Sequence, residues 1–493
     1  AEKVKKLLIC GSIMNGDVSK PLDLDQGLNN LKNLDAGAGI IAQVAAPKPV
    51  YRRSRSKKRW QKTFAAYQAA HMFRTNSMPR ATPISIPANL PTVAELERRE
   101  SLNAIFASCN KFHVNLFDLT EKSGGHPLCT LAVWLLEEYG LQQSLPLNAE
   151  SFSHFVGKIE ERMNEVPYHN KMHVTGVLQA MDYFLAEGGL MSFIVDDYEL
   201  LACLLAAIVH DYQHPGVNNE FLVTTGHDLA LTYNDQAPLE NFHVASAYSL
   251  MKRNKEFDFM EKVSPEDQKH IRGLVIDLVL ATDMSKHFEI LNQGKLLLSD
   301  SESKKFFRST HEEFVKQKAE SSHDLRDRRG RYFLTDHSEK GYYYIDDAER
   351  ALVLRIAMKC ADLNHVFQTF ENHERWCDRI TEEFCQQGDK ELSAGLSPAD
   401  LFSRRSASPL AKSQLVFMDV IVLPLFELLS QLLPATSPML DQVRENRNHW
   451  QAKVASLRSS QEALSASHLR SSEDSSYNNP LREKSLSSVN SGV

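Results

Sequence analysis

Apolar residues recur at spacings of three and four positions between about residues 96 and 458. This spacing places apolar side chains on one face of an α-helix, and few stretches in the region show the alternation or the β-branched runs that are typical of strands. The pattern therefore predicts an all-α domain built from many amphipathic helices. The clearest helices are expected at 101–118, 148–164, 199–210, 265–283, 348–362 and 412–433.

The segments on either side of this helical region have a different composition. Residues 1–95 lack sustained periodicity and end in a Pro-rich run at 78–91, which is typical of an extended linker. Residues 459–493 are rich in Ser, Glu, Asn and Arg, and their apolar content is too small to offset the entropy lost on ordering. We expect a largely non-globular N-terminal arm and a disordered tail. Inside the helical region, the charged stretch 294–346 is expected to be an inserted or mobile segment.

Two segments carry a pair of histidines four positions apart. His169 and His173 form the first pair, and His210 and His214 form the second, in which Asp211 follows the first histidine. On a helix this spacing puts both imidazoles of a pair on one face, about 5–6 Å apart at Cβ. Asp211 comes directly after an apolar segment, so it is expected where a buried helix opens into a pocket. A carboxylate in that position needs a cation or strong hydrogen-bond donors.

A further apolar helix, expected at 348–362, ends in Asp362. Histidines and aspartates at helix ends make a mixed nitrogen and oxygen donor set, which suits a catalytic zinc-like ion with water at its open positions. A single His or Asp in such a place is more often structural. The joint occurrence of these residues after several apolar helices favours a metal-dependent hydrolase.

The overall composition limits the other classes of protein. The chain has 493 residues, of which 42% are hydrophobic and 24% charged, enough for a large buried core. A formal net charge of -7 disfavours a nucleic-acid binder. The 7 cysteines are scattered without CxxC pairs, which favours a reducing compartment. The longest uninterrupted apolar run, at 200–209, is shorter than the roughly 18 residues needed to cross a bilayer. A cytoplasmic protein is expected.

The motifs resemble those of the catalytic domain of class I cyclic-nucleotide phosphodiesterases, a compact multi-helix domain of the HD type, over about residues 150–435. The family signature His-Asp-x2-His-x4-Asn corresponds to His210, Asp211, His214 and Asn219. Segments 244–251 and 275–284 are most similar to the calmodulin-stimulated branch of that family. Further matches follow in the family's order at 233–241, 280–287, 360–363, 382–389 and 413–417.

This resemblance implies hydrolysis of the 3′,5′-phosphodiester of cyclic AMP, cyclic GMP or both. It implies that a tightly held Zn²⁺ is bound by His173, His210, Asp211 and Asp362. A second ion, Mg²⁺ or Mn²⁺, would share Asp211 and otherwise be held through waters. The residues expected around those waters are His214, Glu240 and Thr282. The general acid is expected to be His169. The residues expected to contact the substrate are Tyr168, Asn219, Met284, His365, Ile380, Phe384, Gln414 and Phe417.

Some positions depart from the family's pattern, among them Gln213, Phe242 and Val366, but none of these is an expected metal ligand. His365 stands where many cyclic-AMP-selective members have Asn, which leaves the preferred nucleotide open. Two other functions fit the His and Asp set. One is an HD-type phosphohydrolase that acts on other nucleotides, and the other is an inactive nucleotide-binding scaffold.

The N-terminal arm contains a basic run at 52–59 that is followed by Trp60, Phe64 and Tyr67. Residues 50–75 could therefore form a basic amphipathic helix that binds calmodulin or an acidic membrane surface, with peripheral membrane association in the second case. A solvated basic linker is the alternative.

Overall fold

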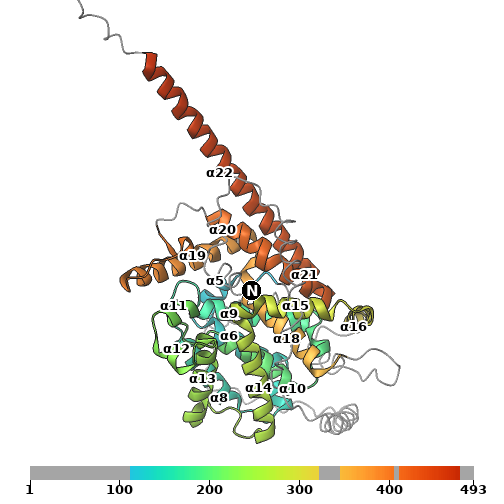
Figure 1. Cartoon of the computed structure of the whole chain (residues 1–493). Coiled ribbons are helices and arrows are strands. Elements are labelled where there is room, and N and C mark those ends of the chain that lie inside the picture. Colours follow the sequence, from blue (N-terminus) through green and yellow to red (C-terminus); the bar gives the residue numbers. More distant parts are fainter. Residues whose placement is uncertain (1–111, 321–344, 405–409, 478–493) are drawn as a thin grey trace, which may run out of the picture. The chain divides into compact units, whose positions relative to one another are not determined.

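The computed structural model describes residues 112–320, 345–404 and 410–477, and the regular elements in these ranges are all helices (Figure 1). The prediction of an all-α fold is confirmed. The arm at 1–95, including the basic segment 50–75, lies outside the described residues.

The first group of helices surrounds α9, in which every residue from His173 to Ala186 is buried. α6 packs against α8 and α9, and α9 packs in turn against α10. Asparagine or aspartate side chains accept backbone N–H groups at the starts of α5, α8, α9 and α10, which satisfies donors that the helix itself leaves unpaired. The bounds are α5 Leu116–Lys122, α6 Pro127–Glu138, α7 Leu141–Ser144, α8 Ala149–Glu161, α9 Lys171–Ala186, η1 Leu190–Phe193 and α10 Asp197–Val209.

The second group continues from α11 to α16, and its long helix α14 packs along α10. Pro238 and Pro265 occupy the first positions of α13 and α14, where a missing N–H does not interrupt the helix. The bounds are α11 Asn219–Thr224, α12 Asp228–Thr232, α13 Pro238–Arg253, η2 Lys255–Phe257, α14 Pro265–Thr282, η3 Met284–Lys286, α15 His287–Leu297 and α16 Ser301–Glu320.

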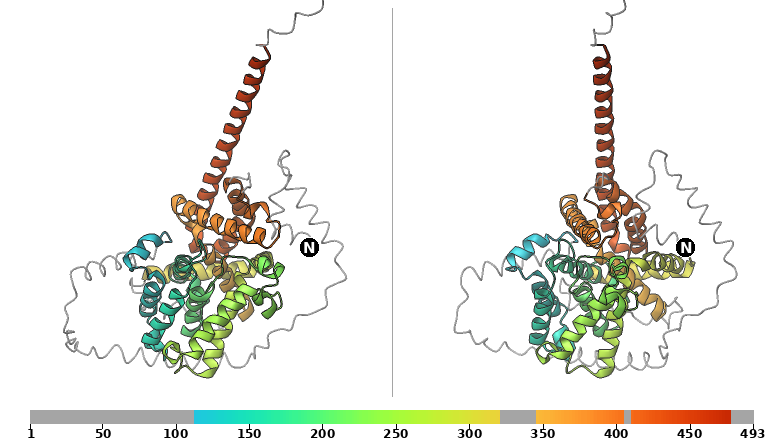
Figure 2. Two further views of the ribbon diagram at one scale, coloured as in Figure 1. Left: turned by 90° about the vertical axis from the view of Figure 1, so that its left-hand side faces the viewer. Right: turned by 60° about the vertical axis from the view of Figure 1, so that its left-hand side comes forward.

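The third group begins with α18, which packs against α9, α14 and α15 and so closes the centre of the bundle. α20 and α21 pack against α22, which Figure 2 shows as one continuous helix. The bounds are α18 Asp347–Asp362, η5 Asn364–Phe367, α19 Phe370–Ser393, η6 Asp400–Phe402, α20 Leu410–Phe417, η7 Met418–Val422, α21 Leu423–Leu432, η8 Pro434–Thr436 and α22 Ser437–Tyr477.

Most of the helices expected from the spacing of apolar residues are present. Those expected at 148–164, 199–210, 265–283 and 348–362 correspond to α8, α10, α14 and α18 within a few residues. The helix expected at 412–433 is a run of α20, the π-helical turn η7 and α21. Of the helix expected at 101–118, residues 112–115 are not helical, and residues 101–111 lie outside the described ranges.

The stretch Leu410–Leu432 is long and apolar enough to cross a membrane by length and composition alone. The longest uninterrupted apolar run, 200–209, does not coincide with this stretch, because isolated polar residues interrupt the apolar sequence of 410–432. Its buried side chains, among them Met418, Leu425 and Phe426, belong to the main hydrophobic core. They pack towards α18 and α22.

Two segments that were expected to be inserted, mobile or disordered are partly helical among the residues that the structure describes. In the charged stretch 294–346, residues 301–320 form α16, which buries Phe306, Phe307 and Phe314. Phe307 stacks on Phe193 with ring centroids 5.7 Å apart, so three aromatic residues anchor an otherwise polar helix. In the tail, α22 runs on to Tyr477, because no Pro or Gly interrupts the chain between Pro438 and Pro480. Residues 321–344 and 478–493 lie outside the described ranges.

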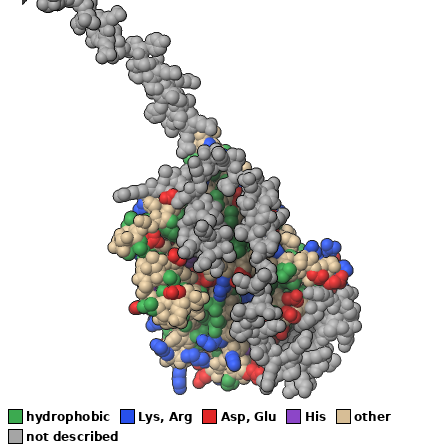
Figure 3. Space-filling view, in the orientation of Figure 1, with side chains coloured by type: hydrophobic (Ala, Val, Ile, Leu, Met, Phe, Trp, Pro, Cys, Tyr) green, Lys and Arg blue, Asp and Glu red, His purple; other side chains and the backbone are tan. Residues whose placement is uncertain are grey.

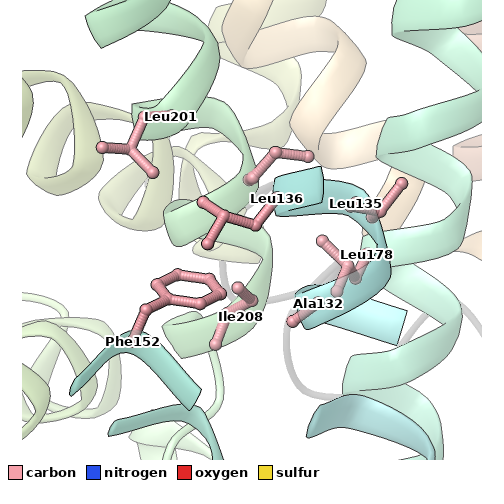
Figure 4. Close-up of a pocket in the computed structure, with 8 residues that line it drawn as sticks. Ala132, Leu135, Leu136, Phe152, Leu178, Leu201 and Ile208 are labelled. Carbon is pink, nitrogen blue, oxygen red and sulfur yellow. The ribbon is translucent and has the colours of Figure 1, made fainter. Parts of the chain in front are cut away.

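A gap in the apolar packing lies between α6, α8, α9 and α10 (Figure 4). Its lining includes Leu136 of α6, Phe152 of α8, Leu178 of α9 and Ile208 of α10, and all the lining side chains are apolar. Such a lining offers no group for acid, base or metal chemistry, so the candidate site has to be sought at the helix ends. On the part of the face in Figure 3 that is not grey, both Lys or Arg and Asp or Glu side chains are present.

Candidate metal centre and active site

The histidine pairs do not lie on single helices, and the expectation of two helical faces is wrong. α9 begins at Lys171 after the cap residue Asn170, whose side chain accepts the N–H of Met172, so His169 precedes the helix. α10 ends at Val209, and Gln213 has a positive φ of 62°, which stops a helix from continuing through the second pair. The predicted residues therefore meet at helix ends and in the turns beside them.

Four side chains from three separate segments converge at one point. Nε2 of His173 lies 3.2 Å from Oδ1 of Asp362 and 3.4 Å from Oδ2 of Asp211. Nε2 of His210 lies 3.3 Å from each of these oxygens and 3.4 Å from Nε2 of His173. A tetrahedron of ligands 2.0–2.1 Å from a central ion has edges of about 3.3–3.4 Å. The spacing of the four donor atoms fits a metal ion at their centre.

Orientation and charge at this cluster also fit a cation. Nδ1 of His210 donates to the carbonyl of Ala207 at 2.9 Å, which leaves its Nε2 lone pair facing the other donors. Burial opposes a positive charge on His210, yet the carboxylates of Asp211 and Asp362 raise its pKa well above 6.5. Oδ2 of Asp211 is buried and accepts no hydrogen bond from the described residues. A cluster that draws a proton onto a buried imidazole attracts a metal cation for the same electrostatic reason.

Gly176 allows the end of α18 to approach α9 closely. It lies one turn after His173, and a Cβ at this position would be 2.7 Å from Oδ1 of Asn364 and 2.8 Å from Cδ1 of Leu116. Asn364 follows Asp362 by two residues, so a larger side chain at 176 would force the Asn364 side chain, next to the aspartate, to shift. The glycine thus belongs to the geometry of the site.

His169 lies beside this cluster and is held by Glu383 of α19. Nδ1 of His169 bonds to Oε1 of Glu383, and Oε2 of Glu383 accepts the backbone N–H groups of Tyr168 at 2.8 Å and of His169 at 3.1 Å. Burial opposes charge on both partners, but their mutual attraction raises the pKa of His169 to about 9 and lowers that of Glu383 to about 2. The ring of His169 is 5.6 Å from that of His173. A protonated imidazole is therefore held next to the cluster.

Further polar side chains lie near Asp211, and one of them faces its other oxygen. Nε2 of His243 lies 3.9 Å from Oδ1 of Asp211, and its Nδ1 donates to the carbonyl of Tyr212 at 2.7 Å. A donor atom of His214 lies within 4.8 Å of donor atoms of Asp211 and His243. Burial and the carboxylate of Asp283 raise the pKa of Glu240 to about 7. These groups could surround a second cation beside the first.

Comparison with known proteins assigns the same region to a protein family. Residues 168–443 match the model of the 3′5′-cyclic nucleotide phosphodiesterase family, which is more than half of the chain. The chain belongs to this family. The match contains the residues that converge here from α9, α10 and α18.

Named phosphodiesterases are among the most similar curated proteins. The rat protein "3′,5′-cyclic-AMP phosphodiesterase 4C" (Rattus norvegicus) is 31% identical over 379 residues, which cover 75% of this chain and 64% of the relative. The "3′,5′-cyclic-AMP phosphodiesterase, isoform F" of Drosophila melanogaster is 29% identical over 409 residues, which cover 79% of this chain and 56% of the relative. The chain thus spans about half to two-thirds of the length of these relatives. The resemblance to the calmodulin-stimulated branch stays a prediction.

Solved phosphodiesterase structures share the fold. The structure of LmjPDEB1 in complex with IBMX superposes with a TM-score of 0.59 at 26% identity, and the match covers 75% of this chain and 100% of that one. The phosphodiesterase domain of the RhoPDE fusion protein from the choanoflagellate Salpingoeca rosetta gives a TM-score of 0.58 at 24% identity, over 73% of this chain and 99% of that one. The helical bundle is therefore that of phosphodiesterase catalytic domains.

The residues expected around the substrate are distributed over several elements of this phosphodiesterase fold. Tyr168 is buried, with its ring 4.7 Å from that of His173 and 5.7 Å from that of His365. Phe384 of α19 meets Phe402 edge to face at 5.2 Å, and Met284 is 45% exposed. Ile380 lies on α19, and Gln414 and Phe417 lie on α20.

Asn219 and Thr282, two further expected site residues, make hydrogen bonds within the protein. Both ends of the Asn219 amide are engaged, because Oδ1 accepts the N–H of Leu239 at 3.0 Å and Nδ2 donates to Glu240 at 2.9 Å. Asn219 thus orients Glu240 in this structure, and its contact with substrate stays a prediction. The hydroxyl of Thr282 donates to the carbonyl of Val279 at 2.8 Å.

A second group of potential metal donors consists of His365, His373 and Cys377. The indole N–H of Trp450 donates to Nε2 of His373 at 2.8 Å, which leaves the proton of His373 on Nδ1, 3.1 Å from Nδ1 of His365. A metal-bound histidine normally donates from its second nitrogen, whereas this nitrogen accepts. The group is better described as a hydrogen-bond chain from α22 to His365.

Sequence reasoning gave no role to Glu383, Gln387 or Lys359. Glu383 and Gln387 lie one turn apart on α19, and Ile380 precedes Glu383 by one turn, so a helical reading of 380–387 would have placed all three on one face. Lys359 is buried, and its Nζ donates to the carbonyls of Ala281 and Thr282 at the end of α14. A lysine inside an apolar helix gives no signal of such a distant partner.

Proposed function

We propose that this chain is a metal-dependent phosphodiesterase that hydrolyses cyclic AMP to 5′-AMP, with cyclic GMP as a second substrate. The observation that carries this proposal is the convergence of donor atoms from His173, His210, Asp211 and Asp362 within 4.8 Å of one another, beside the ring of His169. The similarity to relatives that are named cyclic-AMP phosphodiesterases supports cyclic AMP as the main substrate.

In this proposal the four converging side chains hold Zn²⁺, and the Oδ1 side of Asp211 holds Mg²⁺ or Mn²⁺. The first set has the nitrogen and oxygen donors that zinc prefers, and the second side has few protein donors, as is usual for ions that keep their waters. When bound, the two ions would activate a water molecule and neutralise the charge of the phosphate. His214, Glu240 and Thr282 are proposed to hold the surrounding waters.

His169 is proposed to protonate the leaving 3′ oxygen. Its Nδ1 faces Glu383, so the Nε2 proton is the one that remains available. When the bond between phosphorus and the 3′ oxygen breaks, this oxygen takes the proton, while the oxygen of the attacking water stays on phosphorus. Because the pKa of His169 is about 9, the ring carries this proton at neutral pH.

Gln414 is proposed to recognise the purine. Its Oε1 is buried and accepts no hydrogen bond from the described residues, which is costly unless a ligand donates to it. The amide of glutamine carries both a donor and an acceptor, as the edge of a purine does. Ile380 and Phe417 are proposed to hold the faces of the ring. Tyr168, Met284, His365 and Phe384 are proposed to line the rest of the pocket.

The test is an assay of the purified chain with cyclic AMP, cyclic GMP, a linear dinucleotide and 5′-AMP, with and without a chelator. The proposal expects 5′-AMP from cyclic AMP, loss of turnover with the chelator, and recovery when Zn²⁺ and Mg²⁺ are restored. A preference for the linear nucleotide or the monoester would instead indicate a general HD-type phosphohydrolase. Tight metal binding without turnover of any of these compounds would indicate a scaffold.

The basic segment 50–75 is proposed to bind calmodulin or an acidic membrane surface in a cytoplasmic protein. The support is its sequence alone, a basic run followed by aromatic residues. Calorimetric titration of a peptide of residues 50–75 with calcium-loaded calmodulin, and with vesicles containing phosphatidylserine, tests both partners. The absence of binding at micromolar concentrations would leave a solvated linker.

A further inference from the structure

Gln387 is a buried polar residue of α19 whose amide is fully engaged. Its Oε1 accepts the backbone N–H of Asn218 at 2.9 Å, and its Nε2 donates to Oδ1 of Asn218 at 3.1 Å and to Glu391 at 2.7 Å. Two reciprocal bonds to one residue fix both the distance and the orientation of the contact. These hydrogen bonds hold the N-terminus of α11 against α19.

Asn218, together with the residue that follows it, connects α19 to α13. Its Oδ1 also accepts the N–H of Phe221 and caps α11. The next residue, Asn219, donates to Glu240 at 2.9 Å and accepts the N–H of Leu239 at 3.0 Å. Two adjacent asparagines therefore connect α19 on one side with the first turn of α13 on the other.

α13 approaches one particular side of the metal centre through His243, which lies in its second turn. His243 follows Glu240 by one helical turn, and its Nε2 lies 3.9 Å from Oδ1 of Asp211. The four converging donors use the other oxygen of Asp211, Oδ2. A shift of α13 would therefore change the Oδ1 side, where the second ion is proposed, and leave the tighter set in place.

We infer that Gln387 is a positioning residue which, through Asn218 and Asn219, fixes Glu240 beside the Oδ1 side of Asp211 and so sets the affinity for the second cation. This inference rests on the proposed function for its kinetic consequences, but the placement of Glu240 can be tested by metal binding alone.

The chain offers a matched control at the preceding position. Gln386 also donates to a glutamate of its own helix, Glu382, at 3.1 Å, but among the described residues it makes no side-chain hydrogen bond to another element. Asn218→Asp is a second informative variant, because the two bonds to the Asn218 side chain both use Oδ1, which an aspartate retains. A carboxylate is also an effective cap of a helix N-terminus.

The experiment measures Mn²⁺ binding to the full chain by calorimetry and electron spin resonance, together with zinc content, kcat and KM for cyclic AMP. Loss of a partner outside the ligands of a metal lowers its affinity about 10- to 100-fold, and we expect Gln387→Ala to raise the half-saturating Mn²⁺ concentration roughly tenfold. Zinc content and KM should stay within about twofold of the native values. Gln386→Ala should match the native chain, and Asn218→Asp should stay within about threefold of it.

A native Mn²⁺ titration in folded Gln387→Ala would overturn the inference, and so would an equal change in Gln386→Ala. If circular dichroism shows that Gln387→Ala does not fold, Gln387→Met keeps most of the side-chain volume and removes the bonds. A native Mn²⁺ titration in folded Gln387→Met, or an equal change in Gln386→Ala, would then overturn the inference. Failure of the native chain to hydrolyse any cyclic nucleotide would refute the proposed function, whereas the Mn²⁺ titrations would still decide the role of Gln387.

Discussion

The imidazole of His169 stacks on that of His214, with ring centroids 4.0 Å apart and planes 25° from parallel. The pKa values of the two imidazoles are shifted in opposite directions. Glu383 raises the pKa of His169 to about 9 in spite of burial, whereas burial and the neighbouring charge on His169 hold the pKa of His214 well below 6.5. One positive charge is therefore assigned to His169, and His214 stays neutral.

Replacing Glu383 by Gln should impair the acid more than the metal centre. An acid acts while it is protonated, so activity should fall as the pH rises through the pKa of His169, about 9 in the native chain. Without the carboxylate this alkaline limb should move towards 6.5, and kcat at neutral pH should fall about 10- to 100-fold. A pH profile of kcat measures both effects.

Glu382→Gln is the control for this prediction. Glu382 precedes Glu383 on α19, but its side chain bonds to Arg404 and Gln386 instead of His169. It should leave the alkaline limb unchanged. An unmoved limb in Glu383→Gln would mean that the carboxylate does not set the protonation of His169.

Asp362→Asn should empty the tighter metal site. The change removes a negative charge from a set of four donors, so zinc content should drop and activity should fall by more than about 100-fold, the upper range for groups outside the ligand set. Elemental analysis after dialysis and an assay of cyclic AMP measure the two effects. The exposed Asp441→Asn should keep native zinc content. Full zinc content in Asp362→Asn would contradict the ligand assignment.

Gln414→Ala should weaken substrate binding and spare the chemistry. One or two neutral hydrogen bonds contribute about 1.4 kcal/mol, so KM for cyclic AMP should rise about tenfold while kcat changes little. Steady-state kinetics at saturating metal measure this split. Gln431→Ala on α21 is the control, since its side chain donates only to the backbone of Glu427. A fall in kcat at native KM would rule out purine recognition as the role of Gln414.

Gly176→Ala should loosen the metal centre by separating α9 from the end of α18. Its new Cβ would lie 2.7 Å from Oδ1 of Asn364, and such overpacking costs about 1–3 kcal/mol. Thermal melts and zinc affinity should both fall. Gly273→Ala in α14 is the matched control, because a Cβ there meets nothing within 4 Å, and it should stabilise the chain by about 0.5–1 kcal/mol. Equal effects of the two changes would refute the close approach at Gly176.

The sequence predicted the all-α fold because apolar spacing alone reports which face of a helix is buried. Apolar helix ends pointed to histidines and aspartates, and the family resemblance selected His173, His210, Asp211 and Asp362, whose donor atoms lie within 4.8 Å of one another. It did not predict that His169 precedes α9, because spacing cannot show where a cap such as Asn170 starts the helix. The sequence pattern therefore identified the residues of the site more accurately than it predicted where the helices begin and end.

Contacts between distant segments were the part that sequence could not supply. Glu383 lies 214 positions from His169, and nothing near either residue indicates the partner. α16 was missed for a similar reason, because its charged composition conceals the aromatic side chains that pack on Phe193. In both cases the stabilising group belongs to another element, so local composition is uninformative.

Ile380, Glu383 and Gln387 follow one another along one side of α19, and the proposals above place them beside the purine, the acid His169 and the second cation, respectively. A tilt or twist of this single helix disturbs three functions together. Substitutions that shift α19 would therefore all lower turnover. An assay of turnover alone would not show whether base binding, proton transfer or cation binding was damaged first. If these proposals hold, a compound that displaces Ile380 and tilts α19 would also disturb proton transfer from His169 and binding of the second cation, without contacting either site.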